Sequence, residues 1–178
     1  MELSTERLKL RPFVESDLDN MARLMANEDF MRFSLGTFSR EQTVAFLERV
    51  WVRDRAGLPS QFAVTLAENE RLIGYCGFFL QTVDETEELE IGYRLDSAVW
   101  GKGIATEAAR AVRDHGFCEY ELLRVISLIH PKNLASRRVA EKNGMGPEKE
   151  TVFRGFPTIV FEITREQWRA VKAMDAIA

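Results

Sequence analysis

Hydrophobic and polar positions along this chain follow two different periods, which predict strands and helices. A period of two, typical of a half-buried strand, predicts strands at Leu8–Leu10 and Phe62–Leu66. Further strands are expected over these segments: Arg71–Leu80, Leu89–Leu95, Val125–Ile129, Thr151–Phe153 and Thr158–Thr164. The wider spacing of an amphipathic helix follows Ser16, Ser39, Gly103 and Asn133. The resulting order, β-α-α-β-β-β-α-β-α-β-β, predicts an α+β (α/β-like) fold with a mixed sheet. Since no repeat or linker interrupts it, we expect a single domain over residues 1–178.

Several predicted helix ends carry capping residues. Ser16, with an acidic residue three positions on, predicts the start of the first helix, and Ser39 forms a capping box with Gln42. The last helix is expected over Asn133–Asn143, where the asparagine at its start is a common N-cap. Gly144 then ends this helix in the left-handed conformation.

Composition narrows the class of protein without identifying it. The apolar fraction is 46%, the charged fraction 29%, and the net charge −4, so disorder is excluded and nucleic acid is not expected as a partner. The first residues contain no targeting signal and no apolar run could cross a membrane, so we expect a cytoplasmic protein. Cys76 and Cys118 are far apart, which predicts two reduced core residues and no metal site.

The loop Asp96–Gly103 is the strongest chemical signal in the sequence. It follows a strand, contains Gly101, Lys102 and Gly103, and leads into a helix that begins near Ile104. Glycines allow backbone N–H groups to converge where a helix N-terminus adds positive partial charge, which suits a phosphate or pyrophosphate. The spacing matches neither the dinucleotide fingerprint nor the Walker loop. A plain tight turn would use the same residues, so the loop alone leaves both interpretations open.

Three stretches together carry a resemblance to a known family: TERLKLRPF, EIGYRLDSAVWGKGIATEA and NLASRRVAEKNGM. The chain resembles the GNAT superfamily of N-acetyltransferases over essentially its whole length. Within that superfamily it is similar to the Rim-like branch of ribosomal-protein N-terminal acetyltransferases. The family's loop pattern reads here as Trp100-x-x-Gly103-x-Ala105, where Trp100 replaces the usual Arg or Gln.

The resemblance implies a mostly antiparallel seven-stranded sheet with helices on both faces and two central parallel strands that splay apart. It implies acetyl-CoA as the donor and no metal. The pyrophosphate would bind the backbone amides of Gly101, Lys102, Gly103, Ile104, Ala105 and Thr106. The pantetheine arm would pair with Tyr93, Arg94 and Leu95 and contact Asn133. Gly92 would mark a bulge where the splay begins, although a packing role for this glycine is the alternative.

The resemblance also implies roles in acetyl transfer. The N–H of Leu95 would polarise the thioester carbonyl. Ser136, three residues after Asn133, would protonate the departing thiolate, because the tyrosine that many members use is replaced here by Ala140. A carboxylate should take the proton of the attacking amine, and Glu90 is our leading candidate. Glu85, Glu87, Glu88, His115 and His130 are the alternatives.

The acceptor is expected to be a primary amine, with a protein N-terminus first and a polyamine, amino acid or aminoglycoside next. We expect its pocket between the first two helices and the segment Phe33–Phe38, with the acidic loop Asp84–Glu88 at the rim to attract a cation. A homodimer is possible, as dimers are frequent in the family. The alternatives are a non-catalytic acyl-CoA-binding regulatory domain and a phosphate-binding module unrelated to CoA.

Overall fold

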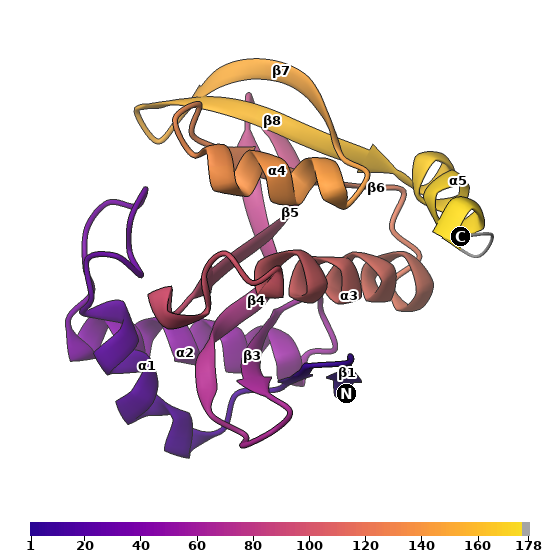
Figure 1. Ribbon diagram of the computed structural model, residues 1–178. Helices are drawn as coiled ribbons and strands as arrows, with labels where there is room; N and C mark the ends of the chain where they lie inside the picture. Colours follow the sequence, from indigo (N-terminus) through magenta and orange to yellow (C-terminus); the bar gives the residue numbers. More distant parts are fainter. Residues whose placement is uncertain (176–178) are drawn as a thin grey trace.

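The computed structural model describes residues 1–175, which form one eight-stranded sheet with helices against both faces (Figure 1). The α+β fold with a mixed sheet is confirmed. The sheet has one strand more than the seven expected, because the two-residue β1 pairs with β2 at the edge. The last residues of the predicted domain, 176–178, lie outside the described part of the chain.

The strands are β1 (Leu3–Ser4), β2 (Leu8–Arg11), β3 (Gln61–Leu66), β4 (Leu72–Val83), β5 (Thr86–Leu95), β6 (Arg124–Ile129), β7 (Gly146–Phe153) and β8 (Phe156–Thr164). The helices are α1 (Leu18–Met25), α2 (Arg40–Arg55), α3 (Ile104–Glu119), α4 (Leu134–Lys142) and α5 (Arg165–Asp175). Two short 3-10 turns, η1 (Glu15–Asp17) and η2 (Ser97–Val99), precede α1 and follow β5.

The centre of the sheet is where its two parallel strands meet. The strand order is β1-β2-β3-β4-β5-β6-β8-β7, and every neighbouring pair is antiparallel except β5 with β6. Within residues 1–175 the parallel ladder has one register pair, Glu90 with Ile126. Beyond that pair the strands separate, each held by its own antiparallel partner, β4 or β8. The predicted splay is therefore present.

Two hydrophobic cores lie on opposite faces of the sheet. α3 and α4 pack on one face, and α3 brings the small residues Ala108 and Ala109 against the strands. α1 and α2 pack on the other face around Phe46, Leu47 and Tyr75. Figure 1 shows α3 and α2 on opposite sides of the strands. Burial of these apolar faces is what fixes both helix layers to the sheet.

The N-terminal cap of the first helix is not the predicted one. Ser16 lies inside the turn η1, and α1 begins at Leu18 without a side-chain cap. The organising group is instead the buried Asp17 carboxylate, which accepts hydrogen bonds from both terminal nitrogens of Arg11 at 2.7 and 2.8 Å. Asp17 also accepts from the backbone N–H of Val14. The ion pair outcompetes the serine because it ties this turn to β2.

The acidic segment Asp84–Glu88 is also not the loop that was expected. Only Asp84 and Glu85 form the turn, with φ of 47° and 67°, and both Glu87 and Glu88 pair with β4 inside β5. Two consecutive residues at positive φ are the mark of a type I′ hairpin turn. The long β4–β5 hairpin therefore projects well past β3.

The predicted bulge at Gly92 is absent. The β4–β5 register runs without a shift from Gly74 with Leu95 to Val83 with Thr86. A Cβ added at Gly92 would lie 3.0 Å from the Phe79 ring, so close packing explains this glycine. The divergence of β5 from β6 thus arises without a bulge in β5.

The other predicted caps are confirmed. Ser39 and Gln42 form the capping box of α2, Asn133 caps α4, and Gly144 has φ of 77°. Cys76 is buried as expected, but Cys118 is exposed on α3, so the prediction of two core cysteines is wrong for one. The helix α5 was not predicted; its Trp168 stacks on Phe117 of α3.

Candidate functional site

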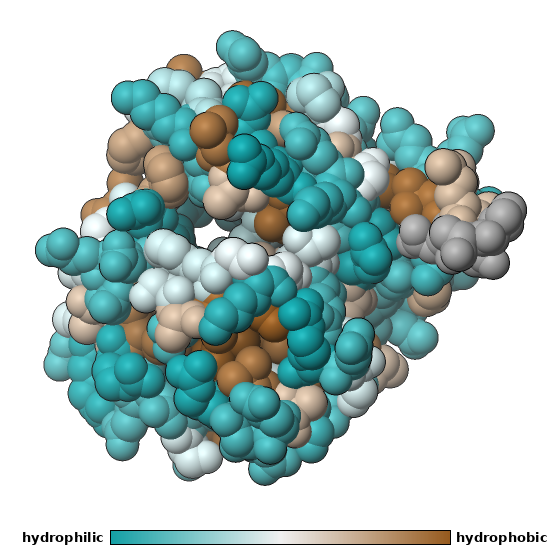
Figure 2. All heavy atoms as spheres, viewed as in Figure 1, coloured by the Kyte–Doolittle hydropathy of each residue, from teal (hydrophilic) through white to brown (hydrophobic). Residues whose placement is uncertain are grey.

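A cavity of about 840 Å³ passes through the opening between β5 and β6. On one side of the sheet it is lined from α3 and α4 by Ala109, Val139 and Ala140. On the other side it is lined by α1, α2 and the segment 31–38, as predicted for the acceptor pocket. The space-filling view shows an opening between α4 and the loop before α3 (Figure 2). The cavity can therefore admit two molecules from opposite faces of the sheet.

The open edge of β5 presents unpaired backbone groups to this cavity. In an antiparallel ladder, residues bonded to the partner strand alternate with residues that face away from it. Asp96 donates its backbone N–H to a β4 carbonyl at 2.7 Å, so Asp96 is bonded to the partner strand. By the alternation, the backbone N–H and C=O groups of Leu95, Tyr93 and Ile91 point away from β4, toward β6. The Ser127 hydroxyl donates to the Ile91 carbonyl at 2.8 Å where the strands begin to part. Beyond that point the edge at Tyr93 and Leu95 has no partner strand.

The loop before α3 carries a continuous run of unpaired amides. Within residues 1–175, no protein acceptor receives a hydrogen bond from the backbone N–H groups of residues 101–106. Gly101 and Gly103 have φ of 75° and 78°, and Gly103 is the N-cap of α3. No atom lies within 4 Å of a Cβ built at Gly101, so its surface is open. Converging amides at a helix N-terminus form an anion site.

Neighbouring residues hold the loop in this shape. Lys102 donates to the Ala98 carbonyl at 3.0 Å, and its own carbonyl accepts from Arg7 at 2.8 Å. Trp100 donates its indole N–H to the Leu95 carbonyl at 2.8 Å, which ties the loop to the end of β5. Arg7 also pairs with Glu107 in the first turn of α3 at 2.6 Å. The carboxylate nearest the amides is thereby neutralised.

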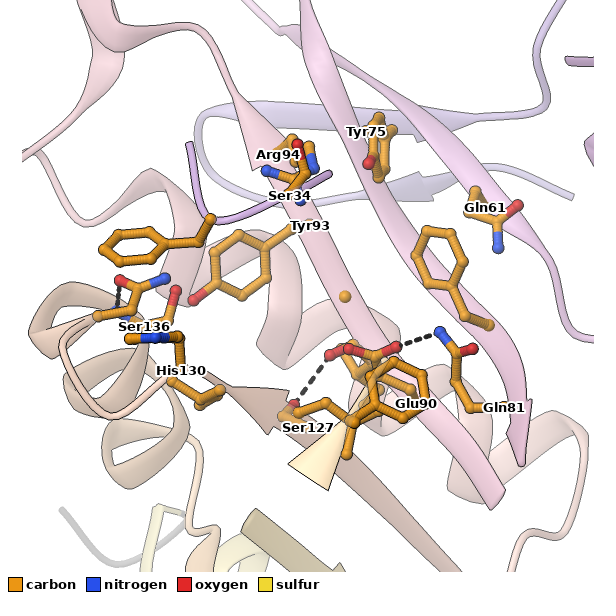
Figure 3. Close-up of a pocket in the computed structure, with 18 of the residues that line it drawn as sticks. Ser34, Gln61, Tyr75, Gln81, Glu90, Tyr93, Arg94, Ser127, His130 and Ser136 are labelled. Atoms are coloured by element: carbon orange, nitrogen blue, oxygen red, sulfur yellow. Dashed lines mark hydrogen bonds between the residues drawn. The ribbon is translucent and has the colours of Figure 1, made fainter. Parts of the chain in front are cut away.

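Four polar side chains line the cavity near the N-terminus of α4: Asn133 and Ser136 from the start of that helix, Tyr93 from β5 and His130 directly after β6 (Figure 3). Asn133 accepts from the Ser136 N–H at 3.2 Å through Oδ1, so its amide nitrogen stays available. Tyr93 points its hydroxyl toward Ser136. Burial raises the pKa of Tyr93, and the interaction with Ser136 partly opposes that rise. His130 packs against Phe33, with ring centroids 5.5 Å apart and planes inclined by 30°, and its Nδ1 accepts from the N–H of Lys132.

Glu90 lies at the opposite end of the open edge, at the last register pair of β5 and β6. Its carboxylate is half-buried on the cavity wall and accepts from Gln81 Nε2 at 2.7 Å (Figure 3). Burial raises the pKa of Glu90, while Gln81 and the charges of Arg154 and Arg94 oppose the rise. A carboxylate with a raised pKa is a better proton acceptor than an exposed one.

The structure brings together only some of the sequence-predicted residues. Glu90, Tyr93, Arg94, Asn133 and Ser136 all line the cavity. The side chain of Leu95 is buried in the core, and residues 101–106 lie beyond the lining, at the start of the helix that continues it.

Of the other candidate bases, some line the cavity and some do not. His130 lines the cavity, whereas His115 packs against Phe62 and Tyr120, where burial lowers its pKa. The side chains of Glu85, Glu87 and Glu88 do not line this cavity, and Glu88 pairs with Arg124 at 3.1 Å.

Two features of the cavity were missed from the sequence. Asn143 Oδ1 is buried and has no hydrogen-bond partner within residues 1–175, although the residue lines the α3–α4 side. Its sequence context signals only a helix end. The lining also contains the arginines Arg32, Arg49, Arg53, Arg94, Arg113 and Arg154, against Glu90 as the one carboxylate among the described residues. They come from five separate segments, which no local pattern connects.

A model of the acetyltransferase (GNAT) domain family matches residues 7–146 of this chain. The protein belongs to the GNAT acetyltransferase family. Family membership confirms the superfamily inferred from the three motifs, and it overturns the alternative of a phosphate-binding module unrelated to CoA.

Similar proteins extend this assignment. The chain is 35% identical over 167 residues to the uncharacterized protein YkkB of Bacillus subtilis, covering 90% of this chain and 94% of the relative. It is 29% identical over 175 residues to the uncharacterized N-acetyltransferase YnaD of Bacillus subtilis, covering 94% and 99%. A solved GNAT-family acetyltransferase from Bacillus anthracis has a TM-score of 0.77 at 28% identity, covering 93% of this chain and 99% of that one.

The Rim-like branch has weaker support. A solved structure of RimL, a ribosomal L7/L12 α-N-protein acetyltransferase in complex with coenzyme A, has a TM-score of 0.77. The match covers 92% of this chain and 98% of that one at 18% identity, which shows a shared fold alone.

The protein is thus an N-acetyltransferase with a fold that implies acetyl-CoA as the donor. Among residues 1–175, no helix combines the length and the apolar character needed to cross a membrane. The same residues contain no cluster of three or more His, Cys, Asp or Glu side chains suited to a metal ion.

Proposed function

We propose that this enzyme binds acetyl-CoA across the α3–α4 face and transfers its acetyl group to a primary amine that enters from the α1–α2 face. The observation that carries the proposal is the run of unpaired amides at residues 101–106, next to a cavity that crosses the sheet. The amides of Gly101, Lys102, Gly103, Ile104, Ala105 and Thr106 would hold the pyrophosphate. Acetyl-CoA supplies the activated acetyl group as a thioester.

The pantetheine arm fits the open edge of β5. Its amides would pair with the free backbone groups of Tyr93 and with the edge N–H of Leu95, whose carbonyl is already taken by Trp100, with Arg94 between them. The available amide nitrogen of Asn133 and the unpartnered Oδ1 of Asn143 offer one further donor and one acceptor. A buried acceptor without a hydrogen-bond partner destabilises the folded protein, because it has lost its bonds to water. A donor from a bound molecule would remove that destabilisation.

The proposed step is direct attack of the amine on the thioester carbonyl. A new C–N bond forms, the C–S bond breaks, and the electron pair leaves with the sulfur. Glu90 takes a proton from the amine nitrogen, through a water where the two do not touch. The Leu95 N–H polarises the carbonyl oxygen. The Ser136 hydroxyl gives its proton to the departing thiolate, and the proton taken up by Glu90 returns through water to Ser136, so that the amine proton ends on the CoA sulfur.

The acceptor is proposed to be a protein N-terminus, with a small amine as the second candidate. The shared fold with RimL supports the first, as does the volume of a cavity lined from α1, α2 and the segment 31–38, about 840 Å³. The position of the cavity between two helix layers is equally compatible with a small amine.

A thiol-release assay tests this function. Acetyl-CoA is mixed with the enzyme and a panel of N-terminal peptides, amino acids, polyamines and aminoglycosides. We expect amine-dependent release of free CoA thiol together with one acetylated product. Tight CoA binding without thiol release over the whole panel would instead favour the non-catalytic, regulatory alternative.

A further inference from the structure

The acceptor half of the cavity has a charge opposite to that of the whole protein. The chain has a net charge of −4, yet the α1–α2 side of the cavity is lined by Arg32, Arg49, Arg53, Arg94 and Arg154. The one carboxylate on the lining is Glu90. Arg113 belongs to the other half, where it is buried and bonded to Asp114 and Asn143.

Most of these guanidinium groups are not neutralised. Within residues 1–175, only Arg32 among the five lies within 4.0 Å of a carboxylate, that of Asp29. Arg49 makes no hydrogen bond to any described residue, and Arg53 donates only its Nε to the Pro59 carbonyl. Clustered positive charges in a low-dielectric cleft raise the local potential and favour an anion.

The register of the sheet explains how one cleft can receive both an anion and an amine. Glu90, Gly92 and Arg94 lie on one face of β5, since side chains alternate along a strand. They pair with Phe79, Gly77 and Tyr75 of β4, so the two residues paired between the carboxylate and the guanidinium are glycines, and the Phe79 ring covers Gly92 as an apolar floor between the two charges. The Cα atoms of Glu90 and Arg94 are about 13 Å apart at the usual rise of a strand.

Arg94 also holds the segment before α2 through hydrogen bonds. It donates to the carbonyls of Phe30 and Arg32 at 3.3 and 2.8 Å with one terminal nitrogen, and the rest of the guanidinium lies against the Tyr75 hydroxyl, opposing the rise that burial causes in the pKa of Tyr75. At the opposite end Arg154 donates to Gln81, which in turn donates to Glu90. Guanidinium groups with free parallel N–H donors suit bidentate binding of a carboxylate.

We infer that the acceptor is a primary amine that also carries a carboxylate, held by the arginines of the α1–α2 side while its amine reaches Glu90. This inference rests on the proposed function and sharpens it, because it disfavours polyamines and aminoglycosides. A free amino acid and a peptide with an acidic second residue present the same chemistry, and the experiment separates these two sources.

The test compares matched acceptors that differ only in the anion. Amino acids are assayed against their carboxamides, and peptides with Asp or Glu at position two against those with Asn or Gln, with spermidine and kanamycin as polycations. We expect kcat/KM for the acidic member to exceed that of its neutral partner by about 10- to 100-fold, the value of one or two charge-assisted hydrogen bonds. The preferred pair shows whether the source is an amino acid or a peptide.

Two α2 variants locate the effect. Arg49→Gln removes a lining guanidinium that bonds to no described residue, so the fold has no bond to lose, and it should reduce the acid-over-amide ratio by raising KM. Arg55→Gln makes the same charge change on the same helix at an exposed residue outside the lining, and should leave the ratio unchanged.

Three outcomes would overturn the inference. Equal kcat/KM for acids and amides, or a preference for the polycations, would contradict the carboxylate while leaving acetyl transfer intact. An equal loss of the ratio in Arg49→Gln and Arg55→Gln would show a long-range charge effect and no binding site. Absence of thiol release with every amine would overturn the proposed function, and this inference with it.

Discussion

At the scale of single residues, the site depends on how each group's surroundings change its chemistry. Glu90 sits at the last point where β5 and β6 touch, and burial raises its pKa, although two arginines act against that rise. Gly103 contributes a positive φ and an open backbone amide, with no chemistry of its own. Each residue therefore makes a distinct prediction.

Replacing Glu90 separates its catalytic and structural effects. The pKa of Glu90 is raised in the folded state, so folding favours its protonated form. The stability that this group contributes is therefore present below the ordinary pKa of a glutamate, and it is lost as the pH rises through the raised pKa of the folded state. Glu90→Gln should thus raise the melting temperature at neutral pH while lowering turnover about 100-fold. Melting curves and kcat/KM profiles against pH check both.

In the wild type, kcat/KM should fall as the pH drops through the raised pKa, and this acidic limb should vanish in Glu90→Gln. A variant that keeps the same limb would assign the base to another group, with His130 the next candidate on the lining.

Replacing Gly103 tests the anion site. Gly103→Asp places a carboxylate where the amides converge and forces a side chain into φ of 78°, so CoA affinity should fall at least ~100-fold while the fold survives a cost of about 1 kcal/mol. Gly57→Asp is the matched control, because Gly57 has φ of 68° and lies after α2, off the cavity lining. Calorimetric titration with CoA should show normal binding in the control. Unchanged affinity in Gly103→Asp would refute the loop assignment.

At the scale of elements, sequence reasoning worked where a local signal governs the structure. The cap at Ser39, the glycine at the end of α4 and the positive-φ loop before α3 all follow from residues within a few positions. It failed where contact with a residue from another element determines the local structure. Ser16 lost the cap to the Arg11–Asp17 pair, and Gly92 reflects the Phe79 ring across the sheet.

Asn133 lets two roles of one element be separated. Its side chain caps α4, and its free amide nitrogen is proposed to contact the cofactor. Asn133→Ala should cost about 1 kcal/mol of stability and also weaken CoA binding. Asn133→Ser keeps a good cap but lacks the amide donor, so it should retain the stability and still bind CoA several-fold more weakly. Full CoA affinity in Asn133→Ser would restrict Asn133 to capping.

At the scale of the whole molecule, the separation of β5 from β6 is the feature that links fold to function. It opens a path through the sheet and leaves the edge at Tyr93 and Leu95 without a partner strand between two helix layers. The family could be inferred from three motifs, and so could the splay. The arginines around the acceptor could not, because Arg32, Arg49, Arg94 and Arg154 converge only when distant segments pack.

A cavity open to both faces predicts that donor and acceptor bind at the same time. No cysteine lines the cavity among the described residues, and burial raises the pKa of the Cys76 thiol, so neither favours a covalent acetyl-enzyme. Initial rates measured while both substrates are varied test this directly. The account predicts double-reciprocal lines that intersect, as direct transfer in a ternary complex requires. Parallel lines, together with an acetylated enzyme isolated in the absence of amine, would contradict it.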